Sequence, residues 1–148
     1  MNKTTRIRQS VKAFIVHAGK IFVVKEKVID NGLEKIIHDV PGGGVDPGES
    51  SHDALLREVM EEVGLTIEVQ HPVGNWDFIL YKTGENIRIV CSWYKCALIG
   101  EPTVNLAKNP AQYEDIIEVL WLTKEEILQS TEILRNLDMR KALERVLI

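Results

Sequence analysis

A glycine-rich loop that leads directly into an acidic helix is the feature that most constrains this fold. Residues 41–49 are dense in Pro and Gly, so we expect a loop there. Ser50 or Ser51 then offers a side-chain oxygen that can cap a helix, and Asp53 stands three residues after Ser50 in capping-box position. Gly64 is the expected left-handed terminator. The sequence therefore predicts a loop over 41–49 and a helix that ends near Gly64.

The two faces of this predicted helix differ in kind. Glu58, Glu61 and Glu62 lie at i, i+3 and i+4, so three carboxylates are neighbours, although like charges at this spacing destabilise a helix. The helix dipole also disfavours anions in the last turn. A solvated acidic face is one interpretation, and a binding site for hard divalent cations is the one that the preceding glycine loop favours. Aliphatic residues that we expect to face the core follow helical spacing: Leu55, Leu56, Val59, Met60 and Val63.

The chemistry of such a carboxylate cluster points to phosphate. Carboxylate oxygens are ligands for Mg²⁺ or Mn²⁺, and this stretch does not offer the set of thiolates and imidazoles that zinc prefers. Protein-bound Mg²⁺ keeps several waters and shares its other positions with substrate phosphate oxygens. Such an ion neutralises a pyrophosphate and lowers the pKa of a bound water. The pattern therefore predicts hydrolysis of a phosphoanhydride bond.

The same stretch resembles the signature of the Nudix hydrolases. It follows the order G-x5-E-x7-R-E-U-x-E-E-x-G-U, where U is aliphatic, and it matches every defined position from Gly43 to Leu65. The resemblance implies an α/β chain with the Nudix fold, an α/β/α sandwich around a mixed central sheet. It also implies an enzyme that uses Mg²⁺, with Mn²⁺ as a possible substitute, to cleave a nucleoside diphosphate linked to another moiety.

By position, the resemblance implies roles for individual residues. Arg57 and Glu49 would form an ion pair that orients the loop against the helix. The general base of the family has no single position: it is either Glu58 or an acid in a later loop, where Glu114 and Asp115 stand. Those two are ordinary loop acids in the alternative interpretation. The metal ligands that the resemblance implies are Gly43, through its carbonyl, and Glu58, Glu61 and Glu62.

Length and charge narrow the class of protein. A chain of 148 residues predicts a single domain, 1–148. The net charge of −4 argues against a nucleic-acid groove, which requires a basic stripe. No apolar run reaches the length of a membrane span. Cys91 and Cys96 have an odd separation, which places them on opposite faces of one strand and argues against a bridge. We therefore expect a reduced, cytoplasmic protein; a homodimer is an alternative to a monomer, because dimers are common in the family.

Strand and helix signals alternate along the rest of the chain, as an α/β sandwich requires. Residues 17–20 are predicted as a hairpin turn, residues 25–35 as a polar segment with a turn at 30–32, and Thr123 with Glu126 as a capping box. The predicted strands are 11–16, 21–24, 36–40, 67–69, 73–81, 87–94 and 116–122. A final helix over 132–147 is expected to bury Ile133, Leu134, Leu137, Leu143, Val146 and Leu147.

Several residues are candidates for substrate contacts, each with an ordinary structural role as the alternative. His38 is a candidate for a polar contact to a base or phosphate, or a packing residue at a strand end. The aromatic candidates for stacking a base, or for the core, are Trp76, Phe78, Tyr81 and Trp93. The cations that could bind phosphate, or simply lie on the surface, are Arg8, Lys12 and Arg88.

The substrate stays open between a nucleoside triphosphate, a nucleotide sugar and similar small nucleotides. A Nudix module that senses a nucleotide without cleaving it is a second hypothesis, which loss of a carboxylate would favour; none of Glu58, Glu61 and Glu62 is lost. An RNA-end pyrophosphohydrolase is a third hypothesis, and the net charge of −4 gives it no support.

Overall fold

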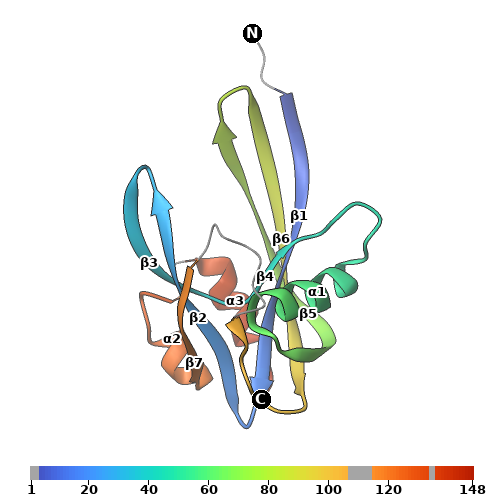
Figure 1. The fold of residues 1–148 in the computed structure, drawn as a ribbon, viewed down its shortest axis with the longest axis vertical. Coiled ribbons are helices and arrows are strands. Elements are labelled where there is room, and N and C mark those ends of the chain that lie inside the picture. Colours follow the sequence, from blue (N-terminus) through green and yellow to red (C-terminus); the bar gives the residue numbers. More distant parts are fainter. Residues whose placement is uncertain (1–3, 107–114, 134–135) are drawn as a thin grey trace.

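A mixed sheet forms the centre of the molecule in the computed structural model, which describes residues 4–106, 115–133 and 136–148 (Figure 1). The strand order is β3-β2-β1-β6-β5, with β4 paired to β1 and β7 paired to β2. In chain order the elements are β1 (Thr4–His17), β2 (Lys20–Asp30), β3 (Leu33–Asp39), β4 (Gly42–Gly44), α1 (Ser51–Val63), β5 (Thr66–Lys82), β6 (Glu85–Ile99), β7 (Asp115–Leu122), α2 (Lys124–Leu128) and α3 (Leu137–Glu144).

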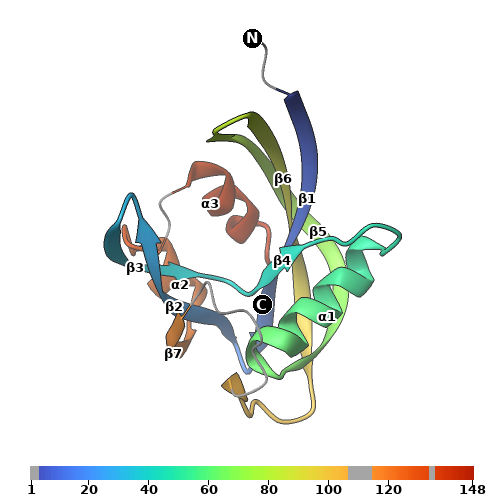
Figure 2. The same cartoon turned by 45° about the horizontal axis from the view of Figure 1, so that its top comes forward.

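The sheet divides into two parts that meet at the β1–β2 turn. The two strands pair beside that turn, through Val16 with Ile21 and His17 with Lys20, and farther along they diverge (Figure 1). The edge of β1 at residues 10–12 is instead paired with β4. On its other edge β1 runs parallel to β6. The chain segment that leads into α1 therefore lies between the two parts of the sheet (Figure 2).

Helices cover both faces of the sheet, which confirms the predicted α/β class and mixed sheet. Buried residues of α1 pack in one core with Ile15 and Phe22, and buried residues of α3 pack in another with Phe14 and Val23. Neighbouring residues of β1 and β2 thus point into different cores, as the twofold periodicity of a strand requires. Within the described residues, no helix has the length and apolar character that a membrane span needs.

The two cysteines follow the same alternation. Cys91 belongs to the core beneath α3 and Cys96 to the core beneath α1, and both are buried and free, which confirms the prediction that they do not form a bridge with each other. Burial raises the pKa of the Cys91 thiol to about 11 and that of Cys96 to about 12. Both side chains therefore remain neutral thiols at physiological pH.

Helix α1 begins and ends as predicted. The Ser50 hydroxyl accepts a hydrogen bond of 3.1 Å from the Asp53 backbone N–H. Gly64 has a φ of +71°, and its N–H donates to the Met60 carbonyl at 3.0 Å. The predicted apolar stripe is partly wrong, because Leu56 and Met60 are exposed. The row that packs on the sheet is Ala54, Leu55, Val59, Glu62 and Val63.

Several predicted strand boundaries differ from the structure; β1, for example, begins at Thr4 rather than at residue 11. In two further places backbone pairing overrides polar composition. Residues 42–44 form β4 rather than a loop, since without side chains this glycine run can lie directly against β1; a Cβ at Gly42 would collide with the Val11 carbonyl oxygen. The polar segment after residue 24 continues β2 to Asp30, paired to β3 around a turn at Asn31 and Gly32.

The last helix is shorter than predicted. It begins at Leu137 because the Asn136 side chain caps it, accepting hydrogen bonds from the N–H groups of Asp138 and Met139. Leu137 and Leu147 are exposed rather than buried, and the predicted core residue Leu134 lies outside the described residues. The capping box of Thr123 with Glu126 is present at the start of α2, as predicted.

Candidate active site

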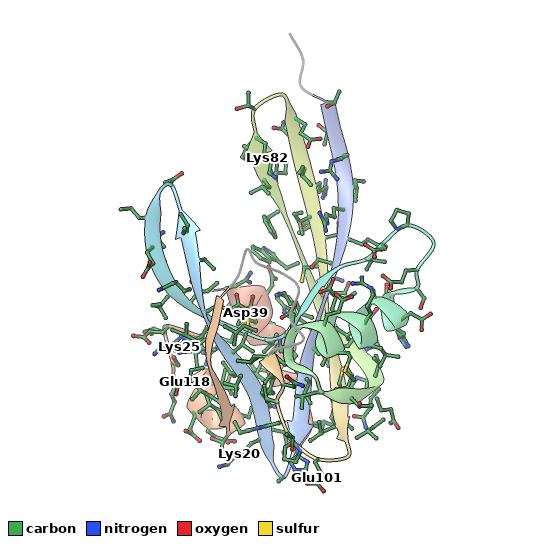
Figure 3. The ribbon with its side chains drawn as sticks, viewed as in Figure 1. Lys20, Lys25, Asp39, Lys82, Glu101 and Glu118 are labelled. Carbon is green, nitrogen blue, oxygen red and sulfur yellow. The ribbon has the colours of Figure 1, made fainter. Side chains whose placement is uncertain are left out.

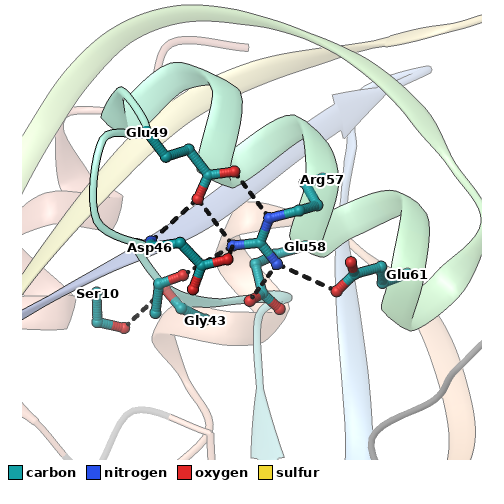
Figure 4. A network of polar contacts seen from close by, with 8 residues as sticks. Ser10, Gly43, Asp46, Glu49, Arg57, Glu58 and Glu61 are labelled. Atoms are coloured by element: carbon teal, nitrogen blue, oxygen red, sulfur yellow. Dashed lines mark hydrogen bonds and ion pairs between the residues drawn. The ribbon is translucent and has the colours of Figure 1, made fainter.

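Strand β4 brings the glycine loop against both β1 and α1. The Ser10 hydroxyl of β1 donates a hydrogen bond of 3.2 Å to the Gly43 carbonyl oxygen (Figure 4). On the other side, the Glu58 carboxyl group lies so close that a Cβ at Gly43 would be 2.5 Å from it. A glycine at this position therefore allows a carboxylate of α1 to lie directly against the loop backbone.

Arg57 ties the loop to the helix. Its Nε and Nη2 atoms donate to the two carboxylate oxygens of Glu49 at 2.8 and 2.9 Å, a bidentate ion pair (Figure 4). Nη2 also donates to the Gly44 carbonyl at 3.1 Å. Glu49 in turn accepts from the Asp46 N–H at 3.1 Å. The hydrogen bonds from Arg57, followed by that from Asp46, lower the pKa of Glu49 to about 2.

The third nitrogen of the same guanidinium bridges two carboxylates of α1. Nη1 of Arg57 donates to Glu58 at 3.0 Å and to Glu61 at 3.2 Å (Figure 4). Burial raises the pKa of the Glu58 carboxyl, and the contacts from Arg57 act in the opposite direction. The positive charge of Arg57 thus lies among Glu49, Glu58 and Glu61 and offsets part of the repulsion that their spacing creates.

These groups fit a hard cation in donor chemistry. The Glu58 carboxylate lies against Gly43, whose carbonyl is a proposed ligand, and a single positively charged nitrogen already bridges Glu58 and Glu61. All three supply the oxygen ligands that Mg²⁺ and Mn²⁺ prefer. Among the residues that the structure describes, however, no three Asp, Glu, His or Cys side chains are gathered as closely as a complete metal centre requires.

The other acids that were predicted for the site are Glu62, Glu114 and Asp115. Glu62 is 7% exposed, so it is buried, and the alternative interpretation of a fully solvated acidic face does not hold for this residue. Glu114 lies outside the described residues, and Asp115 is described through its backbone, which pairs with Lys27 of β2. The structure therefore brings together Gly43, Glu49, Arg57, Glu58 and Glu61 (Figure 4).

A cavity of about 570 Å³ opens on the other face of the sheet, between the strands and the start of α3. Three stacked aromatic rings form one wall of the cavity. The ring centroids of Trp76 and Phe78 are 4.4 Å apart. The centroids of Trp76 and Trp93 are 6.5 Å apart, and the planes of these two rings are nearly parallel. Polar groups complete the lining: Ser10, Lys12, His38, Asp39, Asn136 and Asp138. The cavity thus combines planar apolar surface with a polar rim, as ligand sites do.

The predicted substrate contacts divide between this cavity and other surfaces. Tyr81 is exposed and is not part of the cavity lining. Arg88 pairs with Asp77, and Arg8 lies against the backbone of Gly44. The predicted residues that line the cavity are Lys12, His38, Trp76, Phe78 and Trp93.

Sequence reasoning missed Ser10, Asp39, Asn136 and Asp138 as cavity residues. The sequence did contain a signal for Ser10. Polar side chains stand at alternate positions of its strand up to the apolar Phe14, and such a pattern indicates a polar site on one face. Asn136 also carried a signal, as an Asn followed two residues later by Asp is typical of a helix start. The sequence around Asp39 gave no such signal, because its partner, Lys12, lies on another strand.

Curated proteins with similar sequences match part of this chain. The putative 8-oxo-dGTP diphosphatase of Bacillus subtilis is 35% identical over 65 residues, which are 42% of this chain and 40% of that protein. An RNA pyrophosphohydrolase of Campylobacter jejuni is 37% identical over 75 residues, which are 47% of this chain and 44% of that protein. The chain thus spans less than half the length of these curated relatives.

Solved structures extend the similarity to nearly the whole chain. The MutT protein of Methanosarcina mazei superimposes with a TM-score of 0.69 at 24% identity, over 98% of this chain and 94% of that one. The MutT NUDIX hydrolase of Burkholderia pseudomallei gives a TM-score of 0.64 at 27% identity, over 95% and 98%. The model of the NUDIX domain matches residues 6–146, so this chain belongs to the Nudix family.

Proposed function

We propose that this protein hydrolyses a phosphoanhydride bond in a nucleoside diphosphate linked to another moiety. The observation that carries this proposal is the position of Ser10, which lines the aromatic cavity and also donates to the carbonyl of Gly43, beside Glu58. A single substrate can therefore place its base in the cavity and its pyrophosphate next to the glycine loop.

The residues around Gly43 would hold the metal ion, for which Mg²⁺ is proposed and Mn²⁺ is a substitute. The proposed ligands are the Gly43 carbonyl and the carboxylates of Glu58, Glu61 and Glu62. When bound, the ion would neutralise charge on the pyrophosphate and lower the pKa of a water. Arg57 would orient Glu58 and Glu61, and through Glu49 it would hold the loop on the helix.

The general base is proposed to be Glu58, with Glu114 or Asp115 as the alternative. Glu58 lies against the loop, and burial raises its pKa, which brings this carboxyl closer to the pKa range in which a base accepts a proton readily at neutral pH. A base must also lie within hydrogen-bond reach of the attacking water, and Glu58 lies against Gly43, beside which the proposed ion would bind.

Base binding is assigned to the aromatic wall. Trp76, Phe78 and Trp93 all line the cavity, so a nucleobase that binds there would contact aromatic rings. Stacking is tolerant of base identity, because every base has a π face. His38 and Asn136 on the rim offer the polar groups that could distinguish one base from another.

An RNA 5′ end is the second substrate class, and the curated relatives named RNA pyrophosphohydrolase favour it. Such a substrate has the same terminal phosphoanhydride but continues as a charged chain. The net charge of −4 favours the small nucleotide, because a protein that binds an extended phosphate backbone gains from positive charge.

The test is a hydrolysis panel with Mg²⁺ or Mn²⁺, with and without chelator, and with products separated by chromatography. The panel includes dNTPs and oxidised dNTPs, ADP-ribose, nucleotide sugars, dinucleotide polyphosphates and RNA with a 5′ triphosphate. We expect metal-dependent release of a nucleoside monophosphate from a small nucleotide. Faster turnover of the RNA would support the second class. Absence of turnover, with nucleotides still raising the melting temperature, would contradict the enzyme and favour a sensing module.

A further inference from the structure

Lys12 stands between the aromatic cavity and the carboxylate site. On one edge of β1 it is paired with Trp93 of the cavity wall, and on the other edge with Gly42 of β4. The next residue of β4 is Gly43, against which Glu58 lies. The lysine side chain itself lines the cavity. A substrate that extends from the cavity to Glu58 therefore passes Lys12.

Asp39, at the end of β3, holds the lysine ammonium at the cavity wall. Lys12 Nζ lies 3.1 Å from one carboxylate oxygen of Asp39, and the other oxygen accepts a hydrogen bond of 2.7 Å from the Val40 N–H. The side chains of Lys12 and Asp39 are 20% and 29% exposed, so the pair faces the cavity instead of being enclosed in the core. A backbone-anchored carboxylate thus fixes a positive charge where phosphate oxygens would lie.

We propose that the Lys12 ammonium binds the phosphate group adjacent to the nucleoside and that Asp39 positions it for this contact. The inference rests on the proposed function, in which the aromatic wall takes the base and the Glu58 side takes the bond that is cleaved. An ammonium has three N–H donors, so it can keep its bond to Asp39 while it donates to a phosphate oxygen. Lys12 then makes the cavity select nucleotides over nucleosides.

Binding without metal isolates this contact from catalysis. Titration calorimetry in EDTA would compare dGMP with deoxyguanosine and dAMP with deoxyadenosine. For at least one base, we expect the wild-type protein to bind the monophosphate about tenfold or more tightly than the nucleoside. Lys12→Met should bind the nucleoside as the wild type does and lose the preference. Lys12→Arg should keep most of the preference, because it retains the charge.

Lys25→Met is the matched control. Lys25 is also a strand lysine paired with a carboxylate, at 3.8 Å from Glu118, and it is absent from the described cavity lining (Figure 3). We expect this variant to keep the full preference for the monophosphate. If Lys12→Met does not fold, the salt dependence of wild-type binding replaces it. The preference should fall as NaCl rises from about 0.05 M to about 0.5 M, because the Lys12 side chain is 20% exposed at the cavity, where dissolved ions screen part of its charge.

The outcomes separate this inference from the proposed function. Equal preference in Lys12→Met and wild type overturns the assignment of Lys12, and so does a wild-type protein that binds both ligands equally or binds neither. A preference unaffected by salt also overturns it. Each of these results is compatible with metal-dependent hydrolysis in the panel. Conversely, loss of the preference in Lys12→Met combined with no hydrolysis of any substrate would uphold the contact and overturn the enzyme.

Discussion

The Arg57 network and the aromatic cavity lie on different faces of one sheet and are built in different ways. The network is made of charged groups from a single short stretch, Asp46 to Glu61, joined by hydrogen bonds of 2.8 to 3.2 Å within it. The cavity is made of rings and scattered polar groups from β1, β3, β5, β6 and the start of α3. The residues proposed for the chemical step are thus brought together by their spacing in one segment. The residues proposed to choose the substrate are brought together only by the tertiary structure.

The largest expected effect lies in the network. Glu58→Gln removes a proposed ligand and base but little volume, so we expect the fold to persist and turnover to fall by about 10²–10⁴. Kinetics with the best substrate of the panel, together with a melting curve, test this. The exposed acid Glu101 provides a matched control, since Glu101→Gln should keep both activity and stability. Wild-type turnover in Glu58→Gln would contradict the assignment of this residue.

Arg57→Met should affect stability as well as activity. It leaves Glu49, Glu58 and Glu61 without the guanidinium that lies among them, so we expect a loss of about 1–3 kcal/mol in the free energy of unfolding. Turnover should fall too, because the loop loses its attachment to the helix. Urea denaturation measures the first effect. Arg57→Lys, which retains charge but not the bidentate geometry, should recover part of the stability and little of the turnover.

On the cavity side, Trp76→Ala should raise KM far more than it lowers kcat. Trp76 is the ring between Phe78 and Trp93, and stacking on an aromatic residue contributes about 1–3 kcal/mol to base binding. Steady-state kinetics should therefore show KM rising by about fivefold to a hundredfold. Tyr81→Ala, which removes an exposed ring outside the cavity lining, is the control and should leave KM unchanged. A fall in kcat without a change in KM would remove Trp76 from the binding site.

The smallest effect concerns the pH dependence of stability. Glu49 has a pKa of about 2 in the folded protein, below its ordinary value of 4.5, because Arg57 and the Asp46 N–H bond its charged form. Its contribution is complete above pH 4.5 and is lost as the pH falls through 4.5 towards 2. Melting temperatures of the wild type should therefore fall more steeply over that range than those of Glu49→Gln. Parallel curves for the two proteins would contradict the assigned pKa.

The parts of the molecule that the sequence predicted correctly are those with local causes. Helix α1 begins after Ser50 and ends before Gly64, as predicted, because caps act within one turn. Cys91 and Cys96 lie on opposite faces of the sheet, which follows from strand geometry alone. The strand β4 escaped prediction because its pairing depends on a neighbour about thirty residues away in sequence, β1. The burial of Glu62 was not predictable from helical spacing, because spacing does not show how far the sheet and the neighbouring chain cover a side chain.

The sequence indicated several residues of the cavity but not how the fold brings them together. Trp76, Phe78 and Trp93 were candidates for either the core or a binding face, and alternation within a strand cannot distinguish these roles. The β5–β6 register, which places Trp76 opposite Cys91, and the cap at Asn136 together determine which rings border a space. The spacing of residues along the sequence does not by itself reveal which residues become partners in this way.

The parallel pairing of β1 with β6 also has a consequence for the order in which the protein matures. Ser10 meets Cys91 across this pair, so a cavity wall that contains both must wait for most of the chain to be synthesised. The Arg57 network needs no residue beyond Glu61. During translation, the whole Arg57 network is therefore present long before the pocket that would choose the substrate can close around Met139.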